Sequence, residues 1–548
     1  MRFTTSAKVM TIDCWVEDTA ASNPHKVALI YNQQTLSYAQ LSKKIADKAS
    51  SLAKCGVSHG DRVAWYGLNH PEVFTLLFAC AKIGAILVPL NWRLAEPEVA
   101  AIVANCTPRL LFYDEHFSKQ ALALPNVLAI SVNEAELTEN TLKNSSDNSG
   151  SSSNSNNSNN SNNSNNSNNS DNNSDNNSDN KEINTQRAAM STMRKYFLSS
   201  APKKPSTNDP VLLVYTSGST GHPKGALLSQ KSLISNARMS VHAHNMTSDD
   251  TVLVVLPLFH VGGMNILPTP AFSIGATVLL HERFDPGHAC LDLQKSTLVI
   301  TVPTVLQAMI KNQHWLPEKL DKLKGMSIGS TDVPLSLIDQ IHAINIPVIQ
   351  VYGATETGPF AIYQTINEAM STVGSIGRAG CDCQIRLVMD GKDVKVGEPG
   401  EIWVKGDNVL LEYWQDTELT NQMLQDGWLR TGDVATLDAN GLYWFKDRIK
   451  HVIISGGENI YPTEIERLLI QLPNIHEAAV IGIADSQWGE IPVAVVVASE
   501  DTKNADVLSP LEGQLARYKH PKKVVFVDAL PRNAMGKVVA TDVRSMIN

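Results

Sequence analysis

Short apolar runs alternate with helical patterns over residues 24–115 of this 548-residue chain. Residues 27–31 and 62–66 have the apolar composition of buried strands, whereas residues 37–53 show the amphipathic spacing of a helix. The order strand, helix, strand is typical of βαβ units, whose strands lie parallel. We therefore predict an α/β fold with a largely parallel sheet.

The same pattern resumes over residues 211–350, and the texture of the sequence changes after about residue 380. There, short strand-like runs are joined by glycine turns such as residues 389–392, which favours an antiparallel or barrel-like piece. A chain this long exceeds one hydrophobic core, so at least two domains are expected. We predict a large N-terminal domain over residues 1–449, built of βαβ-type subdomains and this barrel-like piece, and a small α+β C-terminal domain over residues 450–548.

Residues 144–180 consist of Asn, Ser and Asp with a single glycine. The segment has no apolar side chain to bury, so folding cannot offset its loss of chain entropy. We interpret it as a disordered insertion in a surface loop, where added length costs little free energy. A neutral expansion of an Asn-Asn-Ser triplet is favoured over a functional tether.

Composition limits the partners and the compartment. The formal charge is −9 and no long basic run is present, which argues against nucleic acid. The seven cysteines have no paired spacing, and Cys381 and Cys383 are better interpreted as reduced thiols than as metal ligands. Residues 73–89 are strongly apolar but interrupted by Lys82, so they predict a buried helix and a strand rather than a membrane span. The N-terminus lacks a signal-peptide pattern, and we predict a cytoplasmic protein.

Residues 215–225 read Tyr-Thr-Ser-Gly-Ser-Thr-Gly-His-Pro-Lys-Gly and follow an apolar strand at 211–214. Glycines let the backbone approach a ligand, and exposed N–H groups, hydroxyls and an ammonium suit a polyphosphate. Pro223 stands where a Walker loop requires its second glycine, and the dinucleotide-binding glycine spacing is also absent. The run therefore predicts a phosphate-binding loop of another kind.

Five further motifs follow in order, and with this loop they carry a resemblance to a known family. They occupy residues 352–356, 431–433, 447–450, 456–462 and 531–537. From about residue 15 to its end, apart from the Asn/Ser segment, the chain resembles the adenylate-forming superfamily of acyl-CoA synthetases, adenylation domains and luciferases. The resemblance implies a large N-terminal domain and a small mobile C-terminal domain with the active site between them. It also implies two reactions: a carboxylate attacks ATP to give an acyl-adenylate and pyrophosphate, and a thiol, usually coenzyme A, then displaces AMP.

The resemblance assigns roles in ATP binding. The β- and γ-phosphates would be held by Thr216, Ser217, Gly218, Ser219, Thr220, Gly221 and Lys224. Tyr352 would stack on adenine, with Gly353 and Ala354 beside it in the cofactor-binding motif. Thr355 would bond the α-phosphate, Asp433 the ribose, and Arg448 the ribose and a phosphate. Glu356 and Thr216 are the candidate ligands of Mg²⁺. The structural alternatives are a glycine turn for the loop and a helix start, with Thr355 as the cap, for the second motif.

The remaining assignments concern chemistry and domain movement. Lys537 would reach the carboxylate and the α-phosphate as an electrostatic catalyst. Lys450 matches the hinge about which the family rotates its small domain, and Gly456 and Gly457 would line a narrow pantetheine tunnel. His260 would lie beside the carboxylate pocket, where gating, orienting and packing roles stay open.

Two departures from the family pattern weaken the second half-reaction more than the first. Residues 500–515 are shorter than usual, so one helix of the small domain is expected to be trimmed. Lys537 is followed by Val538, where the family often places basic residues that assist with coenzyme A.

The acid itself is the least constrained part of the prediction. The expected walls of the acyl pocket are apolar or small: Val261, Gly262, Met264, Asn265, Val302, Pro303, Gly329, Ser330, Thr331, Gly353, Ala354, Gly358 and Pro359. Such walls favour an aliphatic or aromatic acid over an amino acid, for whose amine Asp332 is the only nearby anchor. We predict an ATP- and Mg²⁺-dependent ligase that joins a medium-chain, long-chain or aromatic acid to coenzyme A, and the resemblance allows a homodimer. The alternatives are a stand-alone adenylation enzyme that loads a carrier protein and a non-catalytic acyl- or nucleotide-binding homologue.

Overall fold

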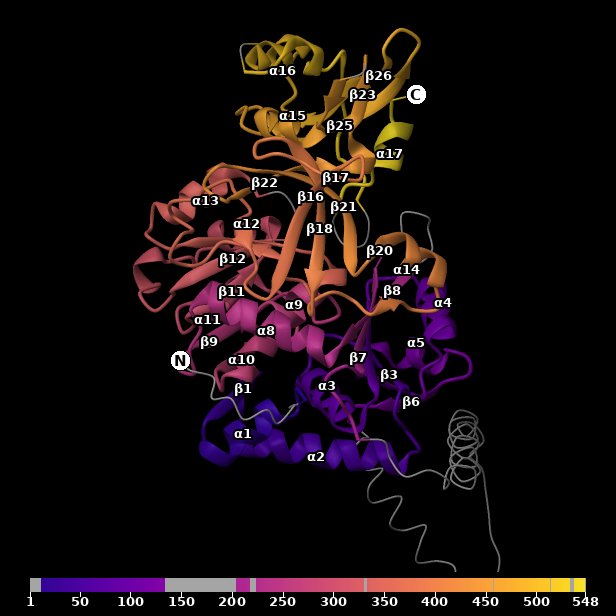
Figure 1. The fold of residues 1–548 in the computed structure, drawn as a ribbon. Helices are drawn as coiled ribbons and strands as arrows, with labels where there is room; N and C mark the ends of the chain where they lie inside the picture. Colours follow the sequence, from indigo (N-terminus) through magenta and orange to yellow (C-terminus); the bar gives the residue numbers. More distant parts are fainter. Residues whose placement is uncertain are drawn as a thin grey trace, which may run out of the picture.

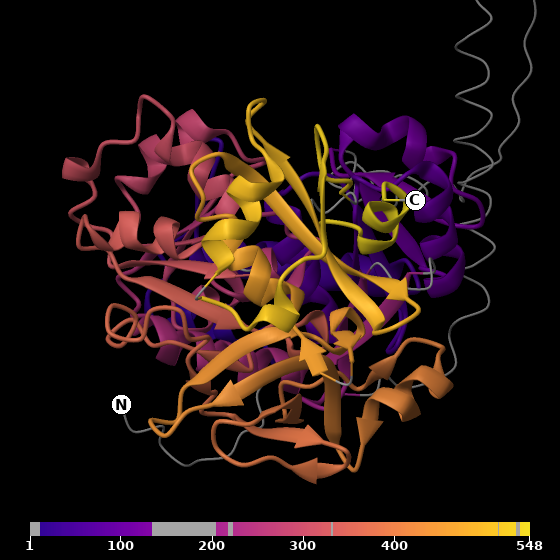
Figure 2. The same ribbon diagram turned by 90° about the horizontal axis from the view of Figure 1, so that it is seen from above.

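A small domain, residues 451–547, sits at one end of a much larger body in the computed structural model (Figure 1). The structure describes residues 11–133, 204–216, 223–329, 333–456, 458–512, 514–532 and 537–547. The Asn/Ser segment lies outside these residues. In the view from above, the small domain covers the region where the parts of the large domain meet (Figure 2).

The described strands of the large domain form two mainly parallel sheets rather than one. The first has the order β15-β14-β13-β12-β11-β9-β10-β1-β2, with antiparallel strands only at its edges. Its strands are β1 Val27–Tyr31, β2 Gln34–Ser37, β9 Thr251–Val254, β10 Thr277–Leu280, β11 Leu298–Thr301, β12 Gly325–Gly329, β13 Val348–Tyr352, β14 Ile362–Tyr363 and β15 Arg378–Ala379.

The second sheet has the order β19-β8-β7-β4-β3-β5-β6. Its strands are β3 Arg62–Tyr66, β4 Ile86–Leu90, β5 Leu110–Tyr113, β6 Leu128–Ser131, β7 Pro210–Thr216, β8 Lys224–Ser229 and β19 Glu412–Tyr413. Strands β3 to β7 are parallel, whereas β8 runs antiparallel to β7 and β19 antiparallel to β8. The predicted parallel α/β arrangement is confirmed, and β7 with β8 forms the hairpin that carries the phosphate-loop motif.

Helices cover these sheets. They are α1 Cys14–Ser22, α2 Tyr38–Lys54, α3 Pro71–Ile83, α4 Glu96–Cys106, α5 Ser118–Leu122, α8 Gln230–His244, α9 Val261–Asn265, α10 Pro268–Ser273, α11 Pro286–Leu293, α12 Pro303–Ile310, α13 Leu335–His342 and α14 Thr417–Met423. Helix α2 begins at a capping box made by Ser37 and Gln40. The apolar segment around residue 80 is the buried helix α3 followed by β4, as predicted, and no described helix is long and apolar enough to cross a membrane.

The third sheet is the antiparallel piece expected after residue 380. Its strands are β16 Cys383–Met389, β17 Lys392–Asp393, β18 Pro399–Gly406, β20 Leu424–Gln425, β21 Trp428–Leu437 and β22 Tyr443–Arg448. The predicted turn at residues 389–392 joins β16 to β17. Strands β21 and β22 lead directly to the small domain, so their ends lie at the junction (Figure 1).

The small domain has its own sheet and core, as expected for an α+β domain. Its strands are β23 Ile453–Ser455, β24 Glu458–Ile460, β25 Ile475–Asp485, β26 Gly489–Ala498 and β27 Lys523–Phe526, and its helices are α15 Pro462–Leu469, α16 Asn504–Leu508 and α17 Ala540–Ser545. Helix α16 is five residues long, in agreement with the short sequence between residues 500 and 515. All seven cysteines lie in the described residues, and none of them forms a disulfide.

Candidate active site

The phosphate-loop motif begins at the end of β7 and ends at the start of β8, two strands that pair antiparallel. Thr216 ends β7 and is paired in register with Lys224, which begins β8. The positive charge of Lys224 acts on Lys450, since it is among the causes that lower the pKa of Lys450. Ser217, Gly218, Ser219, Thr220 and Gly221 lie outside the described residues.

The second motif starts at the carboxyl end of β13. The hydroxyl of Tyr352 donates a hydrogen bond of 2.9 Å to Oδ2 of Asp433, and its ring lies 6.3 Å from that of Phe445. Gly353 comes next, and a Cβ at this position would stand 1.7 Å from the carbonyl oxygen of Pro359. The backbone of the motif therefore folds back on itself so closely that only glycine fits.

A short 3-10 helix, η3 (Thr355–Thr357), follows Ala354. Its cap is not Thr355, the structural alternative for this motif, because the Ala354 N–H donates to Oγ1 of Thr357 at 2.9 Å. Oε1 of Glu356 accepts a hydrogen bond of 2.8 Å from the hydroxyl of Tyr413 on β19. Glu356 is thus a half-buried carboxylate whose orientation is fixed by one of its two oxygens.

Three fully buried asparagines hold the loop after η3. Asn408 donates to the carbonyl oxygens of Thr357 and Phe360, at 3.2 and 2.7 Å. Asn265 donates to the Gly358 carbonyl at 3.1 Å, and Asn236 donates to the carbonyl of Asn265 at 2.6 Å. Because these side chains come from α8, α9 and the loop after β18, the loop is tied to three separate elements.

Asp433 and Arg448 face one another across β21 and β22, where they form a register pair. Nε of Arg448 lies 3.0 Å from Oδ1 of Asp433, whose side chain is only 7% exposed. Burial raises the pKa of Asp433, against the lowering effects of the Arg448 charge and the Tyr352 hydrogen bond. The carboxylate therefore has two partners of its own and faces the junction between the domains.

Lys537 comes from the last segment of the small domain and reaches the same place. Burial lowers its pKa, and the charges of Arg448 and Lys450 act in the same direction. Asp433 and Glu356 oppose this shift, so both carboxylates lie within electrostatic reach of the ammonium. The packing of the small domain against the large one thus brings Lys537 close to Asp433 and Glu356, which lie more than 100 positions earlier in the chain.

His260 precedes α9 and lies near Lys537. Burial lowers the pKa of His260 to about 3, with smaller contributions from the positive charges of Lys537 and Arg93. The imidazole is therefore neutral at physiological pH.

Gly456 directly follows β23, C-terminal to Lys450 in the chain, and has a φ of +61°. A Cβ there would approach Cε3 of Trp488 to 2.8 Å, and the Gly456 N–H donates to the Trp488 carbonyl at 2.8 Å. The indole is 48% exposed, which is unusual for so large an apolar side chain. Gly457 lies outside the described residues.

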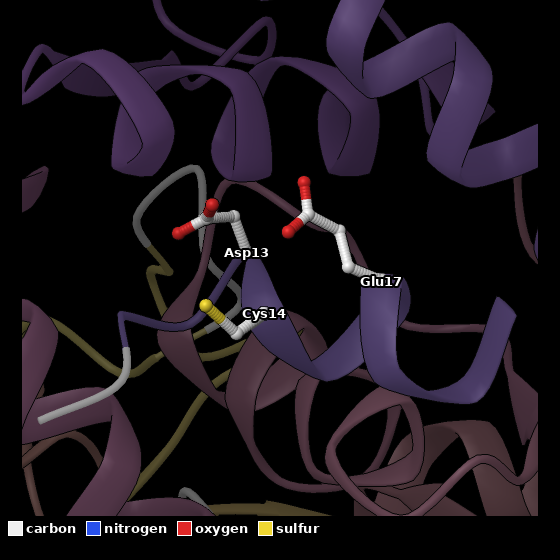
Figure 3. A group of neighbouring side chains, drawn as sticks. All are labelled: Asp13, Cys14 and Glu17. Carbon is white, nitrogen blue, oxygen red and sulfur yellow. The ribbon is translucent and has the colours of Figure 1, made fainter. Parts of the chain in front are cut away.

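Asp13, Cys14 and Glu17 form a separate group of potential metal ligands at the start of α1 (Figure 3). Nζ of Lys82 on α3 pairs with the Glu17 carboxylate and lies 3.6 Å from Oδ2 of Asp13. This ammonium already supplies the positive charge that a metal ion would bring. The group therefore ties α1 to α3.

The family model for AMP-binding enzymes matches residues 16–414. The chain belongs to the AMP-binding enzyme family. The model for the C-terminal domain of these enzymes matches residues 464–537. The predicted resemblance to the acyl-CoA synthetases of the adenylate-forming superfamily is confirmed.

Relatives of this AMP-binding enzyme align with it over almost its whole length. An indoleacetate–CoA ligase of Aromatoleum aromaticum is 41% identical over 545 residues, 98% of each chain. A feruloyl-CoA synthase of Amycolatopsis is 34% identical over 538 residues, 97% of this chain and 98% of the relative. Among solved structures, the o-succinylbenzoate-CoA synthetase of Bacillus subtilis with its acyl-adenylate intermediate has a TM-score of 0.77 at 28% identity, covering 97% of both chains.

Several contacts of this AMP-binding enzyme have no signal in the sequence. Tyr413 fixes Glu356 from 57 positions away, and Phe445 lies beside Tyr352 although both are ordinary strand residues. Trp488 gave no signal either, because its exposure follows from a hairpin turn.

Proposed function

We propose that this enzyme is an ATP-dependent acid–CoA ligase whose acid is aromatic. The observation that carries the proposal is the meeting of Lys537 with Glu356, Asp433 and His260 at the junction of the two domains. An ammonium opposite two carboxylates and beside a neutral imidazole suits a reaction between two anions, a carboxylate and a polyphosphate. The named relatives support the same chemistry, since they are called CoA ligases or CoA synthases.

In the first half-reaction, an oxygen of the substrate carboxylate attacks the α-phosphorus of ATP. The bond from the α-phosphorus to the bridging oxygen breaks, and pyrophosphate leaves. Lys537 stabilises the charge that develops on the phosphoryl oxygens, and Thr355 donates to the same group. Asp433 accepts hydrogen bonds from the ribose hydroxyls, while Lys224 and the hairpin before it hold the leaving pyrophosphate.

The Mg²⁺ that accompanies ATP would be held by Glu356, with Thr216 as a second oxygen ligand. One carboxylate oxygen of Glu356 is fixed by Tyr413, and a hard anionic oxygen is the donor that Mg²⁺ prefers. When bound, the ion neutralises charge on the phosphates. A related o-succinylbenzoate-CoA synthetase of Bacillus subtilis has been solved with ATP and a magnesium ion, which supports the assignment.

In the second half-reaction, the thiol of coenzyme A attacks the acyl carbonyl and AMP leaves, with the thiol proton passing to solvent. We assign Lys450 to the hinge that turns the small domain, because it follows the last strand of the large domain and precedes β23. Gly456 would line the path of the pantetheine arm. Exposed Trp488 beside it offers a face for the adenine of coenzyme A.

An aromatic acid is favoured over a fatty acid. Indoleacetate, ferulate and succinylbenzoate are named in the relatives, and each contains an aromatic ring. The segment after His260 supports a wide pocket, since a Cβ on Gly262 would have only Cδ1 of Ile266 within 4 Å, at 3.8 Å. Open space at this position leaves room for a ring next to the reacting carboxylate.

Replacing Gly262 by Leu is therefore expected to discriminate between acids by size. The added side chain takes up the space proposed for the ring, and such overpacking costs about 1–3 kcal/mol, or about a five- to 150-fold rise in KM for a bicyclic acid. The KM values for ATP and for a single-ring acid should change little. A uniform rise in all three KM values would mean that Gly262 does not face the acyl pocket.

The proposed function is tested with a panel of carboxylates and detection of AMP, with and without coenzyme A. Indoleacetate, ferulate, benzoate, octanoate and palmitate represent the classes. We expect AMP and an acyl-CoA from an aromatic acid only when coenzyme A is present. Turnover of palmitate alone would contradict the aromatic assignment, and pyrophosphate release without thioester in the presence of coenzyme A would favour an enzyme that loads a carrier protein.

A further inference from the structure

The carboxylate of Asp447 bridges the two domains beside the proposed hinge. Asp447 lies near the end of β22, the last strand of the large domain, and is 2% exposed. Its Oδ2 accepts a hydrogen bond of 2.8 Å from the N–H of Thr463, a residue of α15 in the small domain, beyond Lys450 in the chain. Its Oδ1 accepts a bond of 2.7 Å from the Arg448 N–H and lies 3.5 Å from Nδ1 of His451. One side chain thus contacts the large domain, the hinge segment and the small domain.

Helix α15 has no cap of its own. The first N–H groups of a helix lack partners within the helix, and side chains normally satisfy them. Tyr461 occupies the N-cap position without a side-chain hydrogen bond, and Pro462 has no N–H. Thr463 therefore carries the first N–H that needs a partner, and Asp447 of the other domain supplies it.

The charge of Asp447 strengthens this contact. Burial acts to raise the pKa of Asp447, but hydrogen bonds from His451, Thr463 and Arg448 outweigh burial and hold the pKa below its ordinary value. The side chain is therefore anionic, and an anion at a helix N-terminus is stabilised by the helix dipole and by the N–H groups.

We propose that Asp447 is a positioning residue that holds the small domain in the orientation in which Lys537 reaches the adenylation site. This inference rests on the proposed two-step function. A rotation about Lys450 moves Thr463 relative to Asp447, so the hydrogen bond between them breaks before Gly456 can take the place of Lys537. The strength of this one contact then sets the balance between the two orientations.

The test separates the two half-reactions. Pyrophosphate release is followed with ATP and an acid that the wild type uses, and thioester formation is followed from the synthetic acyl-adenylate of that acid and coenzyme A. For Asp447→Ala we expect the first rate to fall about tenfold, the size of a lost charged helix cap. The second rate should stay unchanged or rise, because the competing orientation is weakened.

A matched control is Glu464→Ala on the same helix. Oε2 of Glu464 lies 2.7 Å from Nζ of Lys519, and this ion pair lies entirely within the small domain. Its loss should leave the ratio of the two rates unchanged. Asp447→Asn keeps an oxygen for the Thr463 N–H but removes the charge, so it should give an intermediate ratio, and it provides the same comparison if the alanine variant does not fold.

Equal losses in both half-reactions, or no loss in either, would overturn the role of Asp447. A wild type that releases no pyrophosphate with any acid would instead overturn the proposed function. The two failures are therefore distinguishable, since only the first leaves a wild-type enzyme with both activities.

Discussion

Replacement of Lys537 by Ala is expected to lower the rate of adenylate formation by about a hundred- to a thousandfold, the cost of losing one preorganised donor to a developing oxyanion. The loss should be confined to the first half-reaction, because the proposed second step takes place with Lys537 turned away. Pyrophosphate release and thioester formation from the acyl-adenylate, measured separately, check this. Lys523→Ala, a change at an exposed lysine of β27 in the same domain, is the control and should leave both rates intact.

The alkaline limb of the pH profile gives a second measure of the same residue. The protonated Lys537 is the active form, and burial lowers its pKa from the ordinary value of 10.5. The kcat/KM for ATP, which reports the free enzyme, should therefore begin to fall at a lower pH than an unperturbed lysine would allow. Lys537→Arg should move that limb upward, because a guanidinium stays charged. A limb that does not move would assign the titration to another group.

Replacement of Asp433 by Ala is expected to raise the KM for ATP about ten- to hundredfold, since hydrogen bonds to a charged group contribute about 1.5–3 kcal/mol. The reason is twofold. The ribose loses its acceptor, and both Tyr352 and Arg448 lose the partner that orients them. Initial rates at a series of ATP concentrations, with the acid and coenzyme A saturating, measure the change.

Asp433→Asn is the graded comparison, because an amide oxygen still accepts the Tyr352 hydrogen bond while the ion pair with Arg448 is lost. Its KM should lie between those of the wild type and the alanine variant. Asp438→Ala removes a carboxylate just beyond the end of the same strand, where it bonds the N–H groups of Asn440 and Leu442, and should not change the KM for ATP. An unchanged KM in Asp433→Ala would remove this residue from the ATP site.

The sequence predicted the secondary structure well where the pattern came from neighbouring residues. The strand at 27–31, the helix expected over 37–53 and the glycine turn at 389–392 all appear as predicted. The candidate site residues were predicted through motifs, which are also local. The division of the large domain into βαβ-type subdomains and a barrel-like piece was predicted, but the assignment of each strand to one of two parallel sheets was not, because strand order depends on which apolar faces meet after the helices have packed.

Contacts across the domain junction could not be predicted from the sequence for a physical reason. The cap of α15 stands 16 positions before Thr463, in another domain, so no local rule for helix starts could assign it. The neutral state of His260 depends on burial and on Lys537, a residue near the other end of the chain. Both properties belong to the assembled domains and not to any one segment.

Strand β19 has a consequence for heat resistance. It is a two-residue edge strand paired with β8, and its Tyr413 is the residue that orients Glu356. Short edge strands open at lower free energy than the core of a sheet. The Tyr413 side chain, however, is 4% exposed and packs in the main core, so warming should release the Glu356 carboxylate only when the core around this edge loosens.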